Sequence, residues 1–200
     1  MTGEAADVVT YFRGACSLIF GLALAEGFKQ TVHDKAAQAT DPVLYNEKIF
    51  SLLGFLFLIL PFYQGTMRFY GHFYGAANSL PSNYSFVIMF DSLAFLVEAA
   101  IFFYMSRALS PIHWISFYIA VVVLLWFDTL WGIATAGFHS TPAPTSWIIL
   151  NLVWGAAAFM MVLFNKHLSN ERAVLIGCIG LFIRTVLDYG LNWSFYFPSP

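Results

Sequence analysis

Charged residues are scarce in this sequence. Asp, Glu, Lys and Arg together make up 10% of its 200 residues, whereas they make up about 25% of an ordinary soluble domain. Hydrophobic residues reach 60%, and the mean hydropathy is +0.72. This composition provides too little polar surface for a water-soluble fold, so we expect most of the exterior to face lipid.

Clustered basic residues and paired cysteines are also lacking. The formal net charge is -2, and no group of Lys and Arg would hold a phosphate backbone, which excludes nucleic acid as a partner. Cys16 and Cys178 lie in apolar runs that we place near opposite membrane faces, too far apart for a disulfide. No basic segment precedes the first apolar run, and Glu26 follows it, so we expect this run to be retained rather than cleaved as a signal peptide.

The motifs of common enzyme and cofactor classes are missing as well. The sequence has no HExxH or CxxC spacing for a metal, no P-loop, no GxSxG elbow and no dinucleotide-binding fingerprint. Every lysine lies near a predicted helix end or in a loop, which argues against a retinal Schiff base. The histidines lie at helix ends or in loops, where a membrane haem would not be held. We therefore expect no metal, no cofactor and no catalytic residues.

Six long apolar stretches are separated by short polar or Pro-containing connections. A helix of about 20 residues crosses a bilayer core of about 30 Å. We place such helices at residues 15–33, 48–72, 84–106, 112–136, 146–166 and 172–196. The first is the weakest, because Glu26 and Lys29 shorten its apolar run; if it lies in the membrane interface, five spans remain. The sequence predicts an all-α integral membrane protein, a polytopic bundle of about six transmembrane helices that forms one domain over residues 1–200.

Positive charge is divided unevenly between the two ends of these helices. One end holds Lys29, Lys35, Lys48, Arg107, Lys166 and Arg172. The other holds Arg13 and Arg68. Because Lys and Arg collect in cytoplasmic loops, we expect both termini to lie on the outer side of a plasma or inner membrane. Near the outer helix ends we expect an interfacial aromatic belt of Tyr70, Tyr74, Tyr84, Trp147, Trp193 and Tyr196.

Ionisable side chains occur at membrane depth, where each is costly unless it has a partner or faces a water-filled cavity. The candidates are Glu26, Arg68, Asp91, Glu98, Asp128, Arg184 and Asp188, with His72, Asn151 and Asn192 beside them. The sixth stretch carries Arg184, Asp188 and Asn192 four residues apart, on one helix face. Predicted depth gathers the three aspartates and two arginines into one cluster in the outward half. A separate inner group contains Glu26, Lys29 and Glu98.

Each of these groups has a structural interpretation beside a functional one. Arg184 and Asp188 would also serve as a buried ion pair that fixes helix register. Glu26 and Lys29 lie near a helix end, where a solvated pair is ordinary. Asp128 and Asp91 have no opposite charge within one turn of their own helices. This makes the two aspartates the stronger functional candidates, although an arginine could reach either across the bundle.

These charges favour an ion or polar-solute channel or transport protein that works as a homo-oligomer in the lipid bilayer. Acidic side chains are a common means of attracting cations. The three aspartates would attract the ion, the two arginines would position or gate them, and Glu98 would continue the path inward. A channel of this kind requires Asp91 and Glu98 to line one cavity.

Two other classes of function stay open. A non-catalytic membrane subunit or sensor would use the buried charges to hold a partner protein. A membrane-embedded enzyme would act on a lipid and needs a pocket large enough for a head group.

Overall fold

The computed structural model describes residues 3–32, 42–74, 84–109, 114–139 and 144–198. The elements are α1 (Gly3–Val32), α3 (Pro42–Tyr74), α4 (Tyr84–Arg107), α5 (Trp114–Thr135), α6 (Thr145–Leu163), the 3-10 turn η1 (Asn165–His167), α7 (Asn170–Leu191) and α8 (Trp193–Tyr196). Across these ranges the regular structure is entirely helical, and six helices are long and apolar enough to cross a membrane. The all-α class and the six long apolar helices predicted from the sequence are confirmed.

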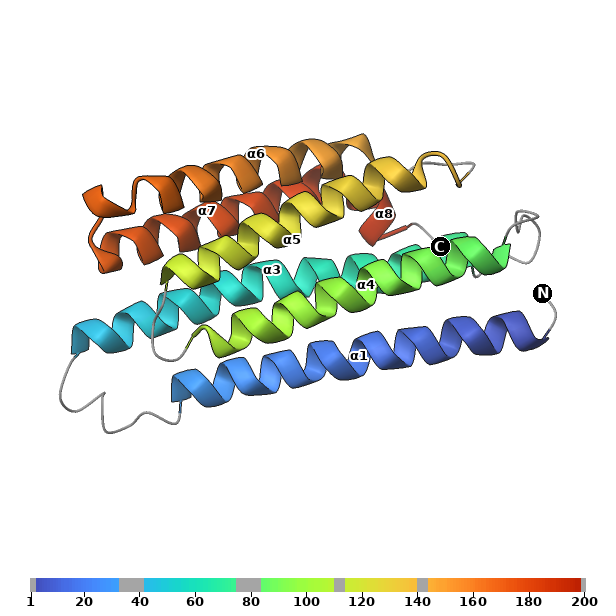
Figure 1. The fold of residues 1–200 in the computed structure, drawn as a ribbon, viewed down its shortest axis with the longest axis horizontal. Helices are drawn as coiled ribbons and strands as arrows, with labels where there is room; N and C mark the ends of the chain where they lie inside the picture. Colours follow the sequence, from blue (N-terminus) through green and yellow to red (C-terminus); the bar gives the residue numbers. More distant parts are fainter. Residues whose placement is uncertain (1–2, 33–41, 75–83, 110–113, 140–143, 199–200) are drawn as a thin grey trace.

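Consecutive long helices run in opposite directions (Figure 1). As a result, both chain termini lie at one end of the bundle, where α1 begins and α7 finishes (Figure 1). We call this the termini end, and we call the other the far end. The side of a membrane that this end would face stays a prediction.

The six long helices close into a ring. Around it, α1 packs on α4, α4 on α5, α5 on α6, α6 on α7, α7 on α3, and α3 back on α1. Glycines permit two close approaches in this ring: an added Cβ at Gly155 of α6 would overlap the Trp126 ring of α5, and one at Gly177 of α7 would overlap the Tyr118 hydroxyl of α5. The ring encloses an interior in which side chains from distant parts of the sequence meet.

A proline inside α3 joins that helix to α7. Pro61 has no backbone N–H, so the carbonyl of Phe57, one turn earlier, lacks its usual helical donor. The hydroxyl of Thr185 on α7 donates to this Phe57 carbonyl. A side chain of the neighbouring helix thus satisfies the backbone group that the proline leaves free, as a membrane interior requires.

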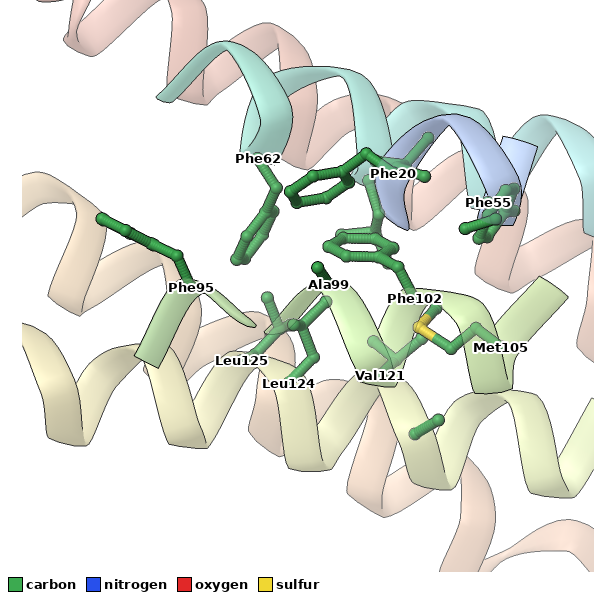
Figure 2. Close-up of a cluster of buried hydrophobic side chains, with 14 of the residues drawn as sticks. Phe20, Phe55, Phe62, Phe95, Ala99, Phe102, Met105, Val121, Leu124 and Leu125 are labelled. Carbon is green, nitrogen blue, oxygen red and sulfur yellow. The ribbon is translucent and has the colours of Figure 1, made fainter. Parts of the chain in front are cut away.

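An aromatic core fills the interior toward the far end (Figure 2). The Phe102 ring of α4 lies 5.4 Å from Phe20 of α1 and 5.4 Å and 6.1 Å from Phe62 and Phe55 of α3, measured between ring centroids. We call these four residues the Phe102 cluster. Met105 of α4 lies beside it (Figure 2). The exterior is apolar as well, with Leu130, for example, 67% exposed, which is the surface expected of a protein in lipid.

Several helix boundaries differ from those predicted; α3, for example, begins at Pro42 rather than at residue 48. The first helix begins at Gly3 rather than at residue 15, because Ala and Glu continue the helix beyond the apolar run. The last is broken: α7 ends at Leu191, and α8 follows after Asn192. The Asn192 side chain turns back and donates to the Asp188 carbonyl at 3.1 Å, and the backbone N–H of Asn192 donates to the same carbonyl at 3.0 Å.

The predicted aromatic belt is wrong for three of its members. Tyr70, Tyr74 and Tyr196 are buried inside the bundle, whereas Trp193 is exposed as predicted. Tyr70 donates to Ser92 at 2.9 Å, so its hydroxyl has a partner within the protein. The side chain of Tyr84 lies outside the described part of the chain, and so does Lys35.

Candidate functional site

Arg184 of α7 lies inside the helix ring, where its side chain is 2% exposed. Its Nη2 donates to Asn151 Oδ1 of α6 at 2.6 Å, and its Nη1 lies 3.5 Å from Asp188 Oδ2, one turn away. Its Cζ lies 5.2 Å from the centroid of the Phe62 ring of α3, a geometry in which the ring face attracts a cation. A buried guanidinium is thus held by an amide, a carboxylate and an aromatic ring.

Two carboxyl groups from neighbouring helices meet beside it. The carboxyl groups of Glu98 of α4 and Asp128 of α5 line the same cavity and lie within hydrogen-bond reach of each other. Asn151 Nδ2 donates to Asp128 Oδ2, so this one amide connects Asp128 to Arg184. Glu98 is buried and Asp128 is half-buried. The four helices α4, α5, α6 and α7 therefore contribute to one polar network.

Asp188 forms the termini-end part of this network. It accepts a hydrogen bond from Asn192 Nδ2 at 2.9 Å and another from the Tyr196 hydroxyl of α8 at 3.1 Å. Burial raises the pKa of the Tyr196 phenol, so the hydroxyl keeps its proton and acts as a donor. Ser146 Oγ of α6 donates to Asn192 Oδ1 at 2.5 Å. These bonds fix the short α8 against the end of α7.

A cavity lies between these groups. Its lining comes from α3 to α8: Pro61, Phe62, Gly65, Thr66, Phe69, Phe95, Glu98, Asp128, Trp131, Trp147, Arg184, Asp188 and Tyr196. Its volume is about 30 Å³. A cavity of about 10–15 Å³ is large enough for one water. The cavity is therefore large enough for about two waters or one small ion.

The cavity wall carries polar atoms without partners. Among the described residues, the buried side-chain atoms that lack a hydrogen bond are Glu98 Oε1, Trp147 Nε1, and Nε and Nη1 of Arg184. All three residues line this cavity. Arg184 Nη1 is close to Asp188 as an ion pair but makes no hydrogen bond to it. An unpartnered buried polar atom costs about 1–3 kcal/mol, so these atoms mark a place where a polar ligand would be stabilised.

Aromatic rings bound the cavity along the bundle axis. Toward the far end, Phe62 belongs both to the cavity wall and to the Phe102 cluster. Toward the termini end, the rings of Phe69, Phe95 and Trp131 pack at centroid distances of 4.8–5.3 Å from one another. Packed aromatic side chains therefore flank the charged groups on both sides along the bundle axis.

Asp91 lies in a second polar group at the termini end. Its Oδ2 accepts from the Tyr74 hydroxyl at 2.5 Å and lies 2.8 Å from His139 Nε2, and its Oδ1 accepts from Trp131 Nε1 at 3.0 Å. The side chain is 0% exposed and is absent from the lining of the cavity. This cavity therefore does not connect Asp91 with Glu98, and a shared ion path for the two residues stays a prediction. Asp91 instead ties the ends of α3, α4 and α5 together.

The other predicted site residues lie away from the cavity. Arg68 Nε donates to the Phe195 carbonyl at 3.1 Å, and His72 is exposed; both line a wider hollow at the termini end with Arg13. Glu26 pairs with Gln30 and with Lys29 toward the far end. The predicted outward cluster thus forms only around Asp128, Asp188 and Arg184, with Asn151 and Asn192. Glu98 joins Asp128 rather than the group around Glu26.

None of the six aromatic residues of the cavity wall was among the predicted site residues, but three of them lie at helical spacing from a predicted residue. Tyr196 follows Asp188 by eight residues and continues the stripe of four-residue steps through Asn192. Trp147 precedes Asn151 by four residues, and Trp131 follows Asp128 by three. The same helical spacing that grouped the charges thus pointed to these aromatic side chains. His139 carried no such signal, because it follows α5 in an irregular segment.

Comparisons of the chain with protein-family models, curated proteins and solved structures give no match. In the described ranges, no group of three or more His, Cys, Asp or Glu side chains is arranged to hold a metal ion. The chemistry of the cavity therefore has to be inferred from its own side chains, which are two neighbouring carboxyl groups, one guanidinium, one further carboxylate and several ring donors.

Proposed function

We propose that this chain is a multi-pass protein of the plasma or inner membrane that carries a small ion or small polar solute, with the charged cavity as its binding site. The observation that supports this most directly is the set of unpartnered polar atoms on Glu98, Trp147 and Arg184 around one cavity. A purely structural ion pair in a membrane protein needs neither a cavity nor unpartnered donors. Charges buried at membrane depth most often serve a substrate or ion pathway.

The geometry favours a carrier over an open pore. Aromatic rings flank the cavity along the bundle axis, with Phe62 on one side and Phe69, Phe95 and Trp131 on the other. Helix discontinuities lie beside the cavity: Pro61 inside α3, and the break between α7 and α8 at Asn192. Interrupted helices next to a central binding site are common in transporters, where they allow one side of the site to open at a time.

The cavity also bears on the alternative functions. A lipid head group is far larger than a space of about 30 Å³ for water centres, so the cavity does not favour a lipid-modifying enzyme. A homo-oligomer or a membrane partner subunit remains a prediction that the cavity does not require.

The test is flux through purified protein in liposomes, with protons, sodium, potassium, chloride and small polar solutes offered in turn. We expect wild-type protein to carry one of them, and Asp128→Asn and Glu98→Gln to reduce that flux about tenfold or more, since about 1.4 kcal/mol of lost stabilisation is a factor of ten. Glu171→Gln is the matched control, because Glu171 is exposed in the first turn of α7 and lies outside the cavity.

Two outcomes would contradict the proposal. One is folded wild-type protein that carries none of these species. The other is flux that both cavity variants leave unchanged, which would place the path outside the cavity.

A further inference from the structure

Glu98 and Asp128 line one cavity with their carboxyl groups within hydrogen-bond reach, and both groups are acceptors when ionised. Two carboxylates at hydrogen-bond distance repel each other, and they share a hydrogen bond only when one of them carries a proton. Asn151 donates to Asp128 Oδ2, which favours ionised Asp128 as the acceptor and Glu98 as the group that carries the hydrogen. The contact thus contains a place for one proton.

The charges around this pair come from the elements packed against it. α7 presents Arg184 and Asp188, α1 presents the Cys16 thiol, α3 the Tyr70 phenol and α8 the Tyr196 phenol, while α6 contributes neutral Asn151. If Glu98 and Asp128 were both ionised, the three carboxylates would exceed the guanidinium by two negative charges. One proton on the pair lowers this excess to one, which low-dielectric surroundings favour.

The cavity gives this proton access to water. Glu98 Oε1 has no partner and lines the cavity, with Trp147 Nε1 and Arg184 Nε as further unpartnered atoms on the same wall. A water that accepts from Trp147 or Arg184 can donate to Glu98 Oε1, and the space holds about two waters. A metal ion fits these surroundings less well, because the Arg184 guanidinium faces the same space.

We infer that Glu98 and Asp128 hold one exchangeable proton between them, and that this proton is the ion bound in the cavity. The proton leaves the carboxyl group for a cavity water and leaves two carboxylates behind; it returns by the reverse step. The statement that this proton is carried across the membrane rests on the proposed function, whereas the shared proton itself does not.

The proton is tested by infrared difference spectroscopy of the purified full chain in lipid nanodiscs, titrated from acidic to alkaline buffer. We expect wild-type protein to show a protonated-carboxyl band at neutral pH that disappears in alkaline buffer and shifts in heavy water. Glu98→Gln and Asp128→Asn each remove this band, and Glu171→Gln leaves it unchanged. Size-exclusion chromatography and circular dichroism show whether each variant is folded. If only one of Glu98→Gln and Asp128→Asn is folded, that variant is sufficient for the test.

The inference of a shared proton is contradicted if wild-type protein lacks the band at neutral pH, or if the band remains after both substitutions. A pH-sensitive dye inside liposomes then reports proton movement separately. If the infrared band is present but the dye reports no proton movement, the shared proton is supported and the transport of protons is contradicted. If the protein carries another ion and the infrared band is absent, the carrier function is supported and the shared proton is contradicted.

Discussion

Arg184 connects most of the polar atoms in the bundle interior. It bonds Asn151, pairs with Asp188 and faces the Phe62 ring, and each of these contacts comes from a different turn or helix. Charged side chains buried together stabilise a fold only as long as each keeps its partners. The stability of the protein is therefore sensitive to loss of this one side chain.

We predict that Arg184→Met lowers the free energy of unfolding by about 3–5 kcal/mol, because it leaves Asp188 as an uncompensated buried charge. The measurement is denaturant unfolding of the purified protein in mixed micelles, followed by circular dichroism. Arg172→Met is the control, since Arg172 is exposed at the start of α7. Equal stability of the two variants would mean that the interior charges are solvated and that Arg184 is not needed to balance them.

At the residue scale, the sequence identified most of the charged site and misplaced part of it. Asp188 and Asn192 could be joined to Arg184, because a spacing of four residues places side chains on one helix face. Asp91 and Arg68 were grouped with them by depth alone. Depth does not say which helix a side chain faces across the bundle, and Asp91 faces Tyr74, Trp131 and His139 instead.

At the scale of helices, Pro61 and Thr185 form a unit that ties α3 to α7. Pro61 leaves the Phe57 carbonyl without its helical donor, and Thr185 supplies one from the neighbouring helix. The same hydroxyl lies 3.0 Å from the Leu181 carbonyl of its own helix. The energy of the contact to Phe57 can therefore be measured only by changing both helices.

We predict that Thr185→Val lowers the free energy of unfolding by about 1–3 kcal/mol, because the Phe57 carbonyl becomes a buried acceptor without a donor. In a Pro61→Ala background the same change costs less, since the new backbone N–H at position 61 bonds Phe57 itself. The measurement is a double-mutant cycle on the two single variants and the double variant. Strict additivity would show that the proline and the threonine are not coupled.

The sequence predicted the six helices well because a long apolar run without charges is a strong signal for a membrane-length helix. It predicted the ends less well. The break at Asn192 was missed, because the polar stripe runs through Asp188, Asn192 and Tyr196 without interruption. At this break the Asp188 carbonyl accepts both the backbone N–H and the side-chain amide of Asn192, at 3.0 Å and 3.1 Å.

At the scale of the whole molecule, the two ends of the bundle differ in charge. The far end holds Lys29, Lys48, Arg107, Lys166 and Arg172, whereas the termini end holds Arg13 and Arg68. In membrane proteins Lys and Arg are enriched on the cytoplasmic side. Because both chain ends lie at the termini end (Figure 1), the orientation of one terminus fixes that of the other.

We predict that both chain ends face away from the cytoplasm. Fusion of a reporter that works only outside the cytoplasm gives activity at either terminus, and fusion of a cytoplasmic reporter after residue 109 or residue 167 gives activity at the far end. Opposite results at the two termini would contradict an even number of spans. Inverted results at all positions would mean that the charge bias does not set the orientation.

The order of helices around the ring was beyond the reach of sequence reasoning. Short connections show only that consecutive helices run in opposite directions. They do not reveal that α3 packs on α7, or that α1 packs on α4. That order decides which faces meet, and it brings Glu98 of α4 to Asp128 of α5 rather than to Glu26 of α1.

The closing of the ring by α7 also has a consequence for how the protein is made. If the helices insert into a membrane in chain order, α4 and α5 enter before α7, so Glu98 and Asp128 are inserted while the guanidinium that balances them has not yet been synthesised. Until α7 arrives, such a nascent chain would expose unpaired polar groups to lipid, which is the kind of intermediate that membrane quality control recognises. We therefore expect ribosomes that stop after α6 to release a product that is degraded rather than a stable five-helix protein.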